Sequence, residues 1–350
     1  MEPTNFPVNF FIRRLLIAVG IGVAVFILLF LLGHLAHLLL LVFAGILVGV
    51  FLRGVANWLS NHVPLSVGWS LTLVIFLVFY LAIMGSLLLG PTIANNFSEL
   101  NQIIPQALAR LQTFLKGHDI IEQLLENFLQ QDKATLLAQN MFSRIAGVFS
   151  SLMGLVVGLL IIFANGFYFS VEPQVYINGV LHLFPKHRRK RASLVLSELG
   201  HVLRWWLVGR IASMTVIGIL TWGGLLLLDI PSAAALAFLA AVLSFVPNIG
   251  PLLSVVPAAL VGWLQGPMSV LYVILLYTII QTLESYVITP LIQRQVIMLP
   301  PALILTAQLA MGMAFGILGV LLATPFAVVI LVLIQMLYIE DILEESVNLP

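Results

Sequence analysis

Long apolar stretches follow one another along the chain, and charged positions are confined to the segments between them. Runs of about 18 or more apolar residues can cross a hydrocarbon core of roughly 30 Å as helices, which rise about 1.5 Å per residue. Six such runs occupy residues 15–32, 35–52, 65–90, 145–171, 211–228 and 268–288. The first two are separated only by Gly33-His34, which predicts a tight helical hairpin. The pattern predicts an all-α integral membrane protein with about six full transmembrane helices.

Residues 91–143, between the third and fourth runs, show a different pattern in which apolar residues recur at helical spacing among polar ones. This pattern predicts extracytoplasmic amphipathic helices that pack on one another, on the membrane surface or on a neighbouring subunit. A spacer resting on lipid and a ligand-binding cap are both compatible with it. The apolar positions are Leu100, Ile103, Ala107, Leu108, Leu111 and Phe114, followed by Ile121, Leu124, Leu125, Phe128 and Leu129.

The apolar runs become short and interrupted in the last third of the chain. Residues 233–246 and 252–263 are apolar, and Pro247-Asn248-Ile249-Gly250-Pro251 separates them. As helices these arms reach about 18–21 Å, which is too short to cross the bilayer, so they predict a re-entrant hairpin. Irregular backbone at membrane depth must be buried in protein or line an aqueous cavity. Its free peptide groups and the Asn248 side chain can hold a polar solute or ion, although a simple loop at the membrane surface is the alternative.

A second interrupted stretch resembles the first. Pro300-Pro301 opens it, Gly316-Ile317-Leu318-Gly319 breaks it, and Thr324-Pro325 follows, while its second arm, 320–339, is also long enough to cross fully. The prolines are 26 residues apart from Pro231 to Pro257 and 25 apart from Pro300 to Pro325. Because the sixth run reverses direction between the stretches, we expect a helix plus a hairpin repeated in inverted orientation. Inverted repeats of this kind underlie alternating access.

Composition supports a bilayer environment. The chain is 61% hydrophobic and 8% charged, against about 45–50% and 25% in soluble domains, so lipid must cover its surface. The formal net charge of +1 gives no whole-chain signal for nucleic acid. The absence of cysteine excludes disulfides, thiolate catalysis and cysteine metal sites. No small-residue cleavage site follows residues 1–14, so we interpret the first apolar run as a retained anchor.

The distribution of Lys and Arg predicts the topology. A cytoplasmic N-terminus places eleven of the fifteen on the cytoplasmic side, which predicts a multi-pass protein of the cell (inner) membrane with both termini cytoplasmic. The cytoplasmic loop 172–206 contains a basic run, Lys186 to Arg191, that we interpret as a topology determinant; contact with anionic lipid or nucleic acid is the alternative. Residues 192–206 predict an amphipathic helix leading into the fifth span, with Leu196, Leu199, Val202, Leu203 and Trp206 on its apolar face.

Few ionisable groups lie within the apolar runs. Gln281, Glu284 and Ser285 share one face of the sixth run at spacings i, i+3 and i+4. A carboxylate there either faces a cavity, where it can exchange a proton or bind a cation, or snorkels to the cytoplasmic interface. Arg210 and Asp229 are expected at the membrane interface, at the ends of the fifth span. Asn165, Gln265 and Gln308 are expected to join helices rather than to bind a solute.

Motifs typical of enzymes are missing from the sequence. It contains no G-x-x-x-x-G-K-[ST] loop, no H-E-x-x-H and no G-x-S-x-G, and its histidines are scattered. We therefore expect no enzyme activity, no catalytic or metal-binding residues, and no cofactor. Transport, if this is the function, would be driven by an ion or solute gradient.

Three motifs together resemble a known family. They are the segment Ser244 to Pro251, Gln281-x-x-Glu284 followed by Thr289-Pro290, and the segment Gly316 to Gly319 followed by Thr324-Pro325. In the order and spacing of these motifs, and in its total length, the whole chain resembles the autoinducer-2 exporter family of bacterial and archaeal permeases. After Pro290 the family has a basic residue and a glycine, whereas this chain has the segment Leu291 to Gln295, which weakens any transfer of substrate identity.

The resemblance implies export of a small polar molecule, which is autoinducer-2 for the namesake, and cation–proton exchange in some relatives. It also implies a homo-oligomer, a pentamer, with an elevator-like moving part. The expected function is a gradient-driven permease for a small polar solute, coupled to protons or sodium; a cation/proton antiporter and a non-transporting membrane scaffold are the alternatives. Expected partners are the lipid bilayer, the solute, the coupling ion and further copies of the chain, but no nucleic acid.

These predictions divide the chain into five parts: a three-span scaffold (1–90), extracytoplasmic helices (91–143), the fourth span with the basic loop (144–206), the transport core (207–340) and an acidic cytoplasmic tail (341–350). The candidate solute- or ion-binding residues are Pro247, Asn248, Gly250, Pro251, Gln281, Glu284, Gly316 and Gly319.

Overall fold

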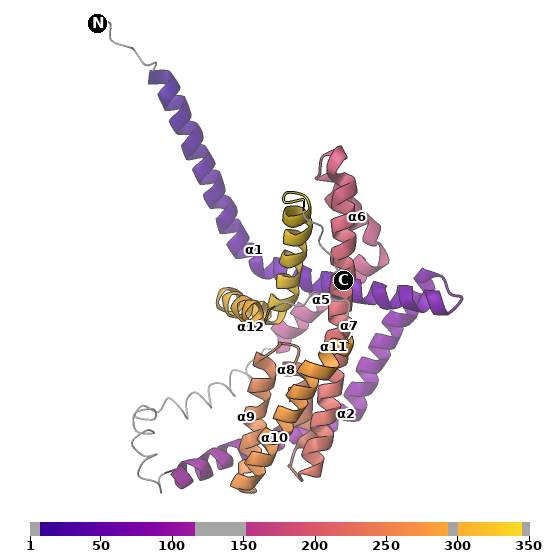
Figure 1. Ribbon diagram of the computed structural model, residues 1–350, viewed down its shortest axis with the longest axis vertical. Helices are drawn as coiled ribbons and strands as arrows, with labels where there is room; N and C mark the ends of the chain where they lie inside the picture. Colours follow the sequence, from indigo (N-terminus) through magenta and orange to yellow (C-terminus); the bar gives the residue numbers. More distant parts are fainter. Residues whose placement is uncertain (1–7, 116–151, 293–299, 345–350) are drawn as a thin grey trace.

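A computed structural model describes residues 8–115, 152–292 and 300–344, and every regular element in those ranges is helical (Figure 1). The α-helices are α1 (Val8–His62), α2 (Val67–Leu115), α5 (Leu152–Val171), α6 (Pro173–His182), α7 (Arg189–Leu227), α8 (Ala233–Leu243), α9 (Ile249–Trp263), α10 (Pro267–Leu283), α11 (Thr289–Ile292) and α12 (Pro301–Leu333). A short 3₁₀ turn, η1 (Lys186–Arg188), and two π-helical segments, η2 (Glu284–Ile288) and η3 (Ile334–Glu340), complete them. The predicted all-α class is confirmed.

Within the described ranges, five helical stretches are long and apolar enough to cross a membrane: 35–62, 67–88, 186–227, 267–288 and 301–340. Three shorter apolar helices, Val157–Val171, Ala233–Leu243 and Ile249–Trp263, accompany them. The start of the predicted fourth span, 145–151, lies outside the described residues. A multi-pass membrane protein is therefore supported, whereas the count of six full spans stays a prediction.

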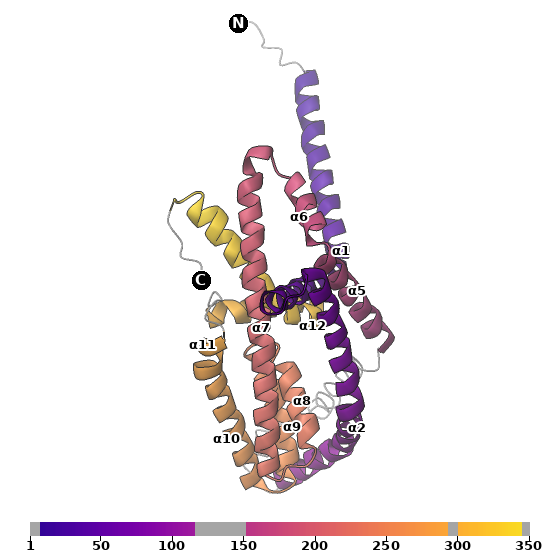
Figure 2. The ribbon, with the colours of Figure 1, turned by 90° about the vertical axis from the view of Figure 1, so that its right-hand side faces the viewer.

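The predicted hairpin at Gly33-His34 is wrong. A single helix, α1, runs from Val8 to His62 through this position, and it changes direction part-way along its length (Figures 1 and 2). One glycine between leucine-rich segments costs a helix only about 1 kcal/mol, and no proline removes a backbone hydrogen bond there. The helix therefore bends but does not end.

Two other predicted boundaries are also crossed by continuous helices. Helix α2 passes through Pro91 and Pro105, so the third apolar run and the first amphipathic segment form one helix. Helix α7 joins the predicted amphipathic helix 192–206 to the fifth span in 39 residues, about 58 Å long. The five-part division of the chain stays a prediction.

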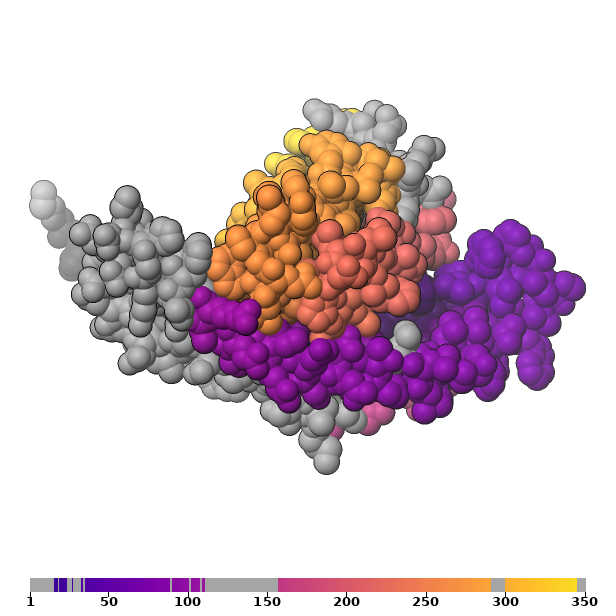
Figure 3. All heavy atoms as spheres, turned by 90° about the horizontal axis from the view of Figure 1, so that it is seen from below, coloured from indigo at the N-terminus to yellow at the C-terminus, as the bar shows by residue number. Residues whose placement is uncertain are grey.

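The second half of α2 packs on the same chain's α8–α9 hairpin, which is not one of the three partners expected for it. Its buried residues Leu100 and Ile104 join an apolar cluster, here called the lower cluster, with residues of α7, α8, α9 and α10. Ser232 donates a hydrogen bond to Glu99 (2.6 Å), and Arg110 donates one to the Leu264 carbonyl (3.1 Å). Figure 3 shows this half of α2 lying across that end of the molecule. The remainder of the predicted segment, 116–143, lies outside the described residues.

A second apolar cluster, here called the upper cluster, packs α1, the first half of α7 and α12 together. From α7 it takes Val195, Val202, Leu203, Trp206 and Leu207. Of the apolar face predicted for 192–206, Val202, Leu203 and Trp206 are confirmed, and Leu199 packs against the cluster, whereas Leu196 is not part of it. The lower cluster takes Ile217 and Leu225 from the second half of the same helix. Helix α7 therefore connects the two clusters.

Candidate functional site

The interruption predicted at Pro247–Pro251 is a break between two short helices. Helix α8 has 11 residues and α9 has 15, which correspond to about 16 and 22 Å. Asn248 sits in the break with φ 64° and ψ −53°. A Cβ on Gly250 would overlap the carbonyl oxygen of Leu243 at the end of α8, so only glycine permits this close approach. The break between two short helices is observed, whereas a re-entrant hairpin in the bilayer stays a prediction.

The second predicted interruption is also a backbone break. Gly316 has φ 64° and ψ −146° inside α12, and this non-helical residue divides α12 into the arms 301–315 and 317–333. A Cβ on Gly319 would overlap the carbonyl oxygen of Met311 in the first arm. The two breaks therefore share two features. Each contains a residue at φ 64°, Asn248 or Gly316. Two or three residues later, each has a glycine that lies against a backbone carbonyl of the preceding arm.

An ion pair that the sequence did not predict lies beside the first break. Nη1 of Arg210 is 3.1 Å from Oε1 of Glu284, and the two side chains are only 5% and 7% exposed. Nε of Arg210 donates a hydrogen bond to the carbonyl of Phe245 (3.1 Å), in the break itself. The Phe245 ring packs edge-on against Trp206, one helical turn before Arg210.

Arg210 was expected at the end of a span, but it is buried in the protein in the middle of α7; its depth in a bilayer stays a prediction. The expectation took the helix of the fifth span to begin after Arg210, whereas α7 begins at Arg189. Asp229 does follow the end of α7 and is exposed. The missed signal was the amphipathic pattern of 192–206, which has no helix stop before the apolar run and so predicts a single helix through Arg210.

Glu284 points inward and does not snorkel. Its Oε1 accepts from Arg210, and its Oε2 accepts a hydrogen bond from Nε2 of Gln281 at 2.7 Å. Gln281 also approaches the hydroxyl of Ser285 at 3.5 Å. The predicted polar face of the sixth run is thus assembled around the carboxylate, at the point where α10 gives way to η2.

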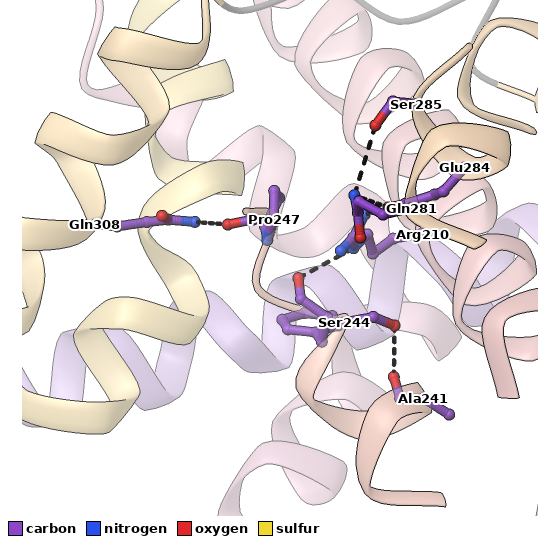
Figure 4. Close-up of polar contacts among 9 residues, drawn as sticks. Arg210, Ala241, Ser244, Pro247, Gln281, Glu284, Ser285 and Gln308 are labelled. Carbon is purple, nitrogen blue, oxygen red and sulfur yellow. Dashed lines mark hydrogen bonds and ion pairs between the residues drawn. The ribbon is translucent and has the colours of Figure 1, made fainter. Parts of the chain in front are cut away.

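Gln308, on the first arm of α12, connects the two broken elements. It is 1% exposed, and its Nε2 donates a hydrogen bond to the Pro247 carbonyl at 3.0 Å (Figure 4). Its expected role in joining helices is confirmed. Gln265 likewise donates to the Asp229 carbonyl, whereas Asn165 bonds Ile161 within its own helix.

The peptide groups of the first break are partly satisfied by the protein itself. Phe245 and Pro247 offer carbonyls that accept from Arg210 and Gln308, so side chains from α7 and α12 meet at the same turn. Two buried polar atoms beside this turn have no hydrogen-bond partner among the described residues: Nη2 of Arg210 and Oε1 of Gln308. Buried polar atoms are nearly always paired, so unpaired ones at one turn need an explanation.

The eight predicted site residues thus differ in what the structure gives them. Pro247, Gln281 and Glu284 come together with Arg210 (Figure 4). Gly250 and Gly319 are buried at the close approaches, and Asn248 and Gly316 supply the exposed turns. Pro251 lies in the first turn of α9, where proline is tolerated. Solute binding by these residues stays a prediction.

A separate surface hollow lies far from the ion pair. It is lined by Ala109, Arg110 and the segment 263–267, at the opposite end of α9 from the break. The hollow contains no member of the polar group around Glu284. The broken helices are therefore the better candidate site.

Comparison with known proteins identifies the family. A family model described as "AI-2E family transporter" matches residues 9–339. The chain belongs to the AI-2E transporter family. This AI-2E transporter is 24% identical over 304 residues to YueF of Bacillus subtilis, covering 82% of the chain and 80% of the relative. It is 25% identical over 299 residues to YrrI of the same organism, covering 83% of each; both relatives are named as candidate transport proteins.

A third relative has a more specific name. The AI-2 transport protein TqsA of Escherichia coli is 22% identical over 301 residues, which cover 83% of this chain and 84% of the relative. The family consists of membrane transport proteins, which agrees with the permease predicted from the three motifs. The AI-2E transporter described here is therefore a membrane permease with a buried ion pair beside the break between α8 and α9, and α12 donates a hydrogen bond to the same break.

Proposed function

We propose that this AI-2E transporter is a secondary, gradient-driven permease that exports a small polar solute, such as the signalling molecule autoinducer-2. The observation that carries the proposal is the buried Arg210–Glu284 pair bound to the break between α8 and α9. Intramembrane ionisable groups are costly, and in transporters they mark solute and ion pathways. Broken helices in transporters usually flank the binding site.

The two breaks supply the moving parts of the proposed mechanism. Gln308 of the α12 arm holds the Pro247 carbonyl, so a displacement of either hairpin changes the surroundings of the ion pair. Two alternative arrangements of such hairpins would expose a central site to opposite sides of the membrane in turn. Glu284 is proposed as the coupling residue, which exchanges a proton or binds sodium during this change.

The proposal is tested with purified protein in proteoliposomes that contain a pH-sensitive dye. Autoinducer-2 and a panel of small polar solutes are supplied as outward gradients, with and without a sodium gradient. We expect solute-dependent pH changes with the wild type, and a folded E284Q variant without them. E172Q, which removes an exposed carboxylate at the end of α5, is the matched control and should behave as wild type.

Each alternative predicts a different result. Sodium-driven pH changes without any organic solute would identify a cation/proton antiporter. A folded wild type that moves none of the solutes and no protons would favour a membrane scaffold. Unchanged coupling in E284Q would reject the role of Glu284.

A further inference from the structure

The guanidinium of Arg210 has one edge that the described part of the chain leaves open. Its Nε bonds the Phe245 carbonyl and its Nη1 bonds Glu284, but Nη2 is buried without a partner among the described residues. A guanidinium presents its N–H groups as a planar fork that matches carboxylate and phosphate oxygens. The residue itself is 4% exposed, so the open edge is not one that bulk water satisfies.

The charge balance of the pair selects what can bind there. Arg210 and Glu284 sum to zero charge while their atoms are 3.1 Å apart. A bare cation placed on the Glu284 carboxylate would also lie beside the guanidinium, whose charge opposes it strongly in a poorly solvated site. An anion placed on Arg210 would likewise be repelled by the negatively charged carboxylate of Glu284. Protonation of Glu284 removes that repulsion and leaves a buried cation, which is costly unless an anion replaces the lost partner.

We propose that the transported solute carries a carboxylate, phosphate or similar anionic group that binds Arg210 while Glu284 is protonated, so that a proton and the anion travel in the same direction. This inference rests on the proposed permease function and specifies its solute class and coupling ion. The open acceptor of Gln308, Oε1, lies on the other side of the same turn and supplies a contact for a donor group of the solute.

The other groups around Glu284 do not alter this balance. The elements packed against η2 are α7, α10 and α11. Helix α11 carries no titratable side chain, and α10 carries no charged residue and only two tyrosines, Tyr272 and Tyr277. On α7, Arg210 is the charged group in contact with the carboxylate; the remaining charged or titratable side chains of that helix lie nearer its N-terminus, at Arg189, Lys190, Arg191, Glu198, His201 and Arg204.

The proposed cycle conserves charge and protons. On one side of the membrane Glu284 takes a proton from water and Arg210 exchanges its carboxylate partner for the anion. On the other side the anion and the proton leave, and the Arg210–Glu284 pair forms again. Linkage makes the two effects equal: binding of the proton raises the affinity for the anion by a certain factor, and binding of the anion raises the affinity for the proton by the same factor. For a monovalent anion the net charge moved is zero.

A binding experiment on the full chain in detergent tests the inference without knowledge of the solute. The probe is formate, the smallest carboxylate, against a chloride background of constant ionic strength, with affinity derived from the formate dependence of the melting temperature. E284Q fixes the uncharged state of residue 284, and R210Q/E284Q removes both charges. We expect formate to bind E284Q about 5–150-fold more tightly than wild type at pH 8, the usual range of coupling between two ligands, and not to stabilise R210Q/E284Q.

Equal effects of formate on E284Q and R210Q/E284Q would overturn the inference and leave a purely structural ion pair. Should E284Q fail to fold, proton uptake by wild type on addition of formate in unbuffered detergent solution replaces it. About one proton per bound formate supports the inference, whereas no uptake contradicts it.

Failure of the inference and failure of the permease function are distinguishable. Solute flux in proteoliposomes without accompanying protons, or in exchange for sodium, contradicts the inference but retains the permease. Formate binding to E284Q with no flux of any solute contradicts the permease instead.

Discussion

Arg210 and Glu284 stabilise each other because each would otherwise be an isolated charge away from water. Their side chains are 5% and 7% exposed, and their remaining bonds go to the Phe245 carbonyl and the Gln281 amide. Removing both charges of a buried pair is often nearly neutral for stability, whereas removing one leaves an uncompensated charge. This asymmetry gives the pair a clear thermodynamic signature.

The single substitution R210Q should therefore destabilise the protein more than the double substitution R210Q/E284Q. We expect a loss of about 3–5 kcal/mol for R210Q and a substantial recovery in the double variant, measured by thermal unfolding in detergent. R188Q, which removes an exposed cation near the start of α7, should leave the melting temperature unchanged. Equal losses in the single and double variants would contradict a mutually compensated pair.

Gln308 is the second residue on which the break depends. In Q308L the partly buried Pro247 carbonyl loses its donor, and an acceptor without a partner costs up to about 1–3 kcal/mol when it is away from water. We expect this loss in unfolding free energy, together with slower flux in proteoliposomes. T306A, on the same arm, removes an exposed hydroxyl that bonds only its own helix and is the control. A Q308L protein as stable as T306A would refute the connection.

At the scale of elements, each of the two broken helices has a point at which its second arm packs closely against its first arm. Gly250 faces the Leu243 carbonyl, and Gly319 faces the Met311 carbonyl. Neither backbone oxygen can move aside as a flexible side chain can. The similarity of the two breaks supports the repeat expected from the proline spacing, while the inverted orientation stays a prediction.

Alanine at either close approach should displace the arms of its hairpin. We expect G250A and G319A each to lose about 1–3 kcal/mol, the usual cost of overpacking, and to lose flux. G223A is the control, because a Cβ at this α7 glycine meets nothing within 4 Å; it should be neutral or stabilising by up to about 1 kcal/mol. The melting temperatures and the solute flux of the three variants test this prediction. Full transport activity in G250A would be incompatible with the observed packing.

At the scale of the whole molecule, α7 carries residues of both apolar clusters. Leu207 belongs to the upper cluster and Ile217 to the lower one, and Arg210 lies between them. The ion pair is therefore placed where relative movement of the two clusters would act on it. The lower cluster includes the second half of α2, so deletion of 91–143 would remove part of the core that supports the α8–α9 hairpin.

The start of α7 is also tied to the end of the second broken helix. Arg191 bonds the Met336 carbonyl and forms ion pairs with Glu340 (2.6 Å) and Asp341 (2.9 Å), all partly exposed. We expect R191Q to lower stability by about 1 kcal/mol or less at low salt. The difference from wild type should shrink at 0.5 M salt, a condition of roughly 4 Å Debye length, because screening weakens the exposed pairs. A loss independent of salt would assign the effect to the Met336 bond alone.

Sequence reasoning located the local features of the site but not its central contact. The Pro247 and Gly316 breaks were predictable because proline, glycine and positive φ act on the backbone within a few residues. The Gln281–Glu284 face was predictable from helical spacing. The pairing of Arg210 with Glu284 was missed because the two residues are 74 positions apart, and no local pattern reports which side chains of distant helices meet.

The sequence by itself determined that this protein is a helical membrane protein with two interrupted segments, because apolar run length and backbone-breaking residues act locally. Only the tertiary structure decided that α1 is continuous, that α2 supports the first hairpin, and that Arg210, Glu284 and Gln308 converge on one turn. These outcomes depend on packing between helices far apart in the chain, where the cost of burying a charge is offset only by a partner that the fold brings to it.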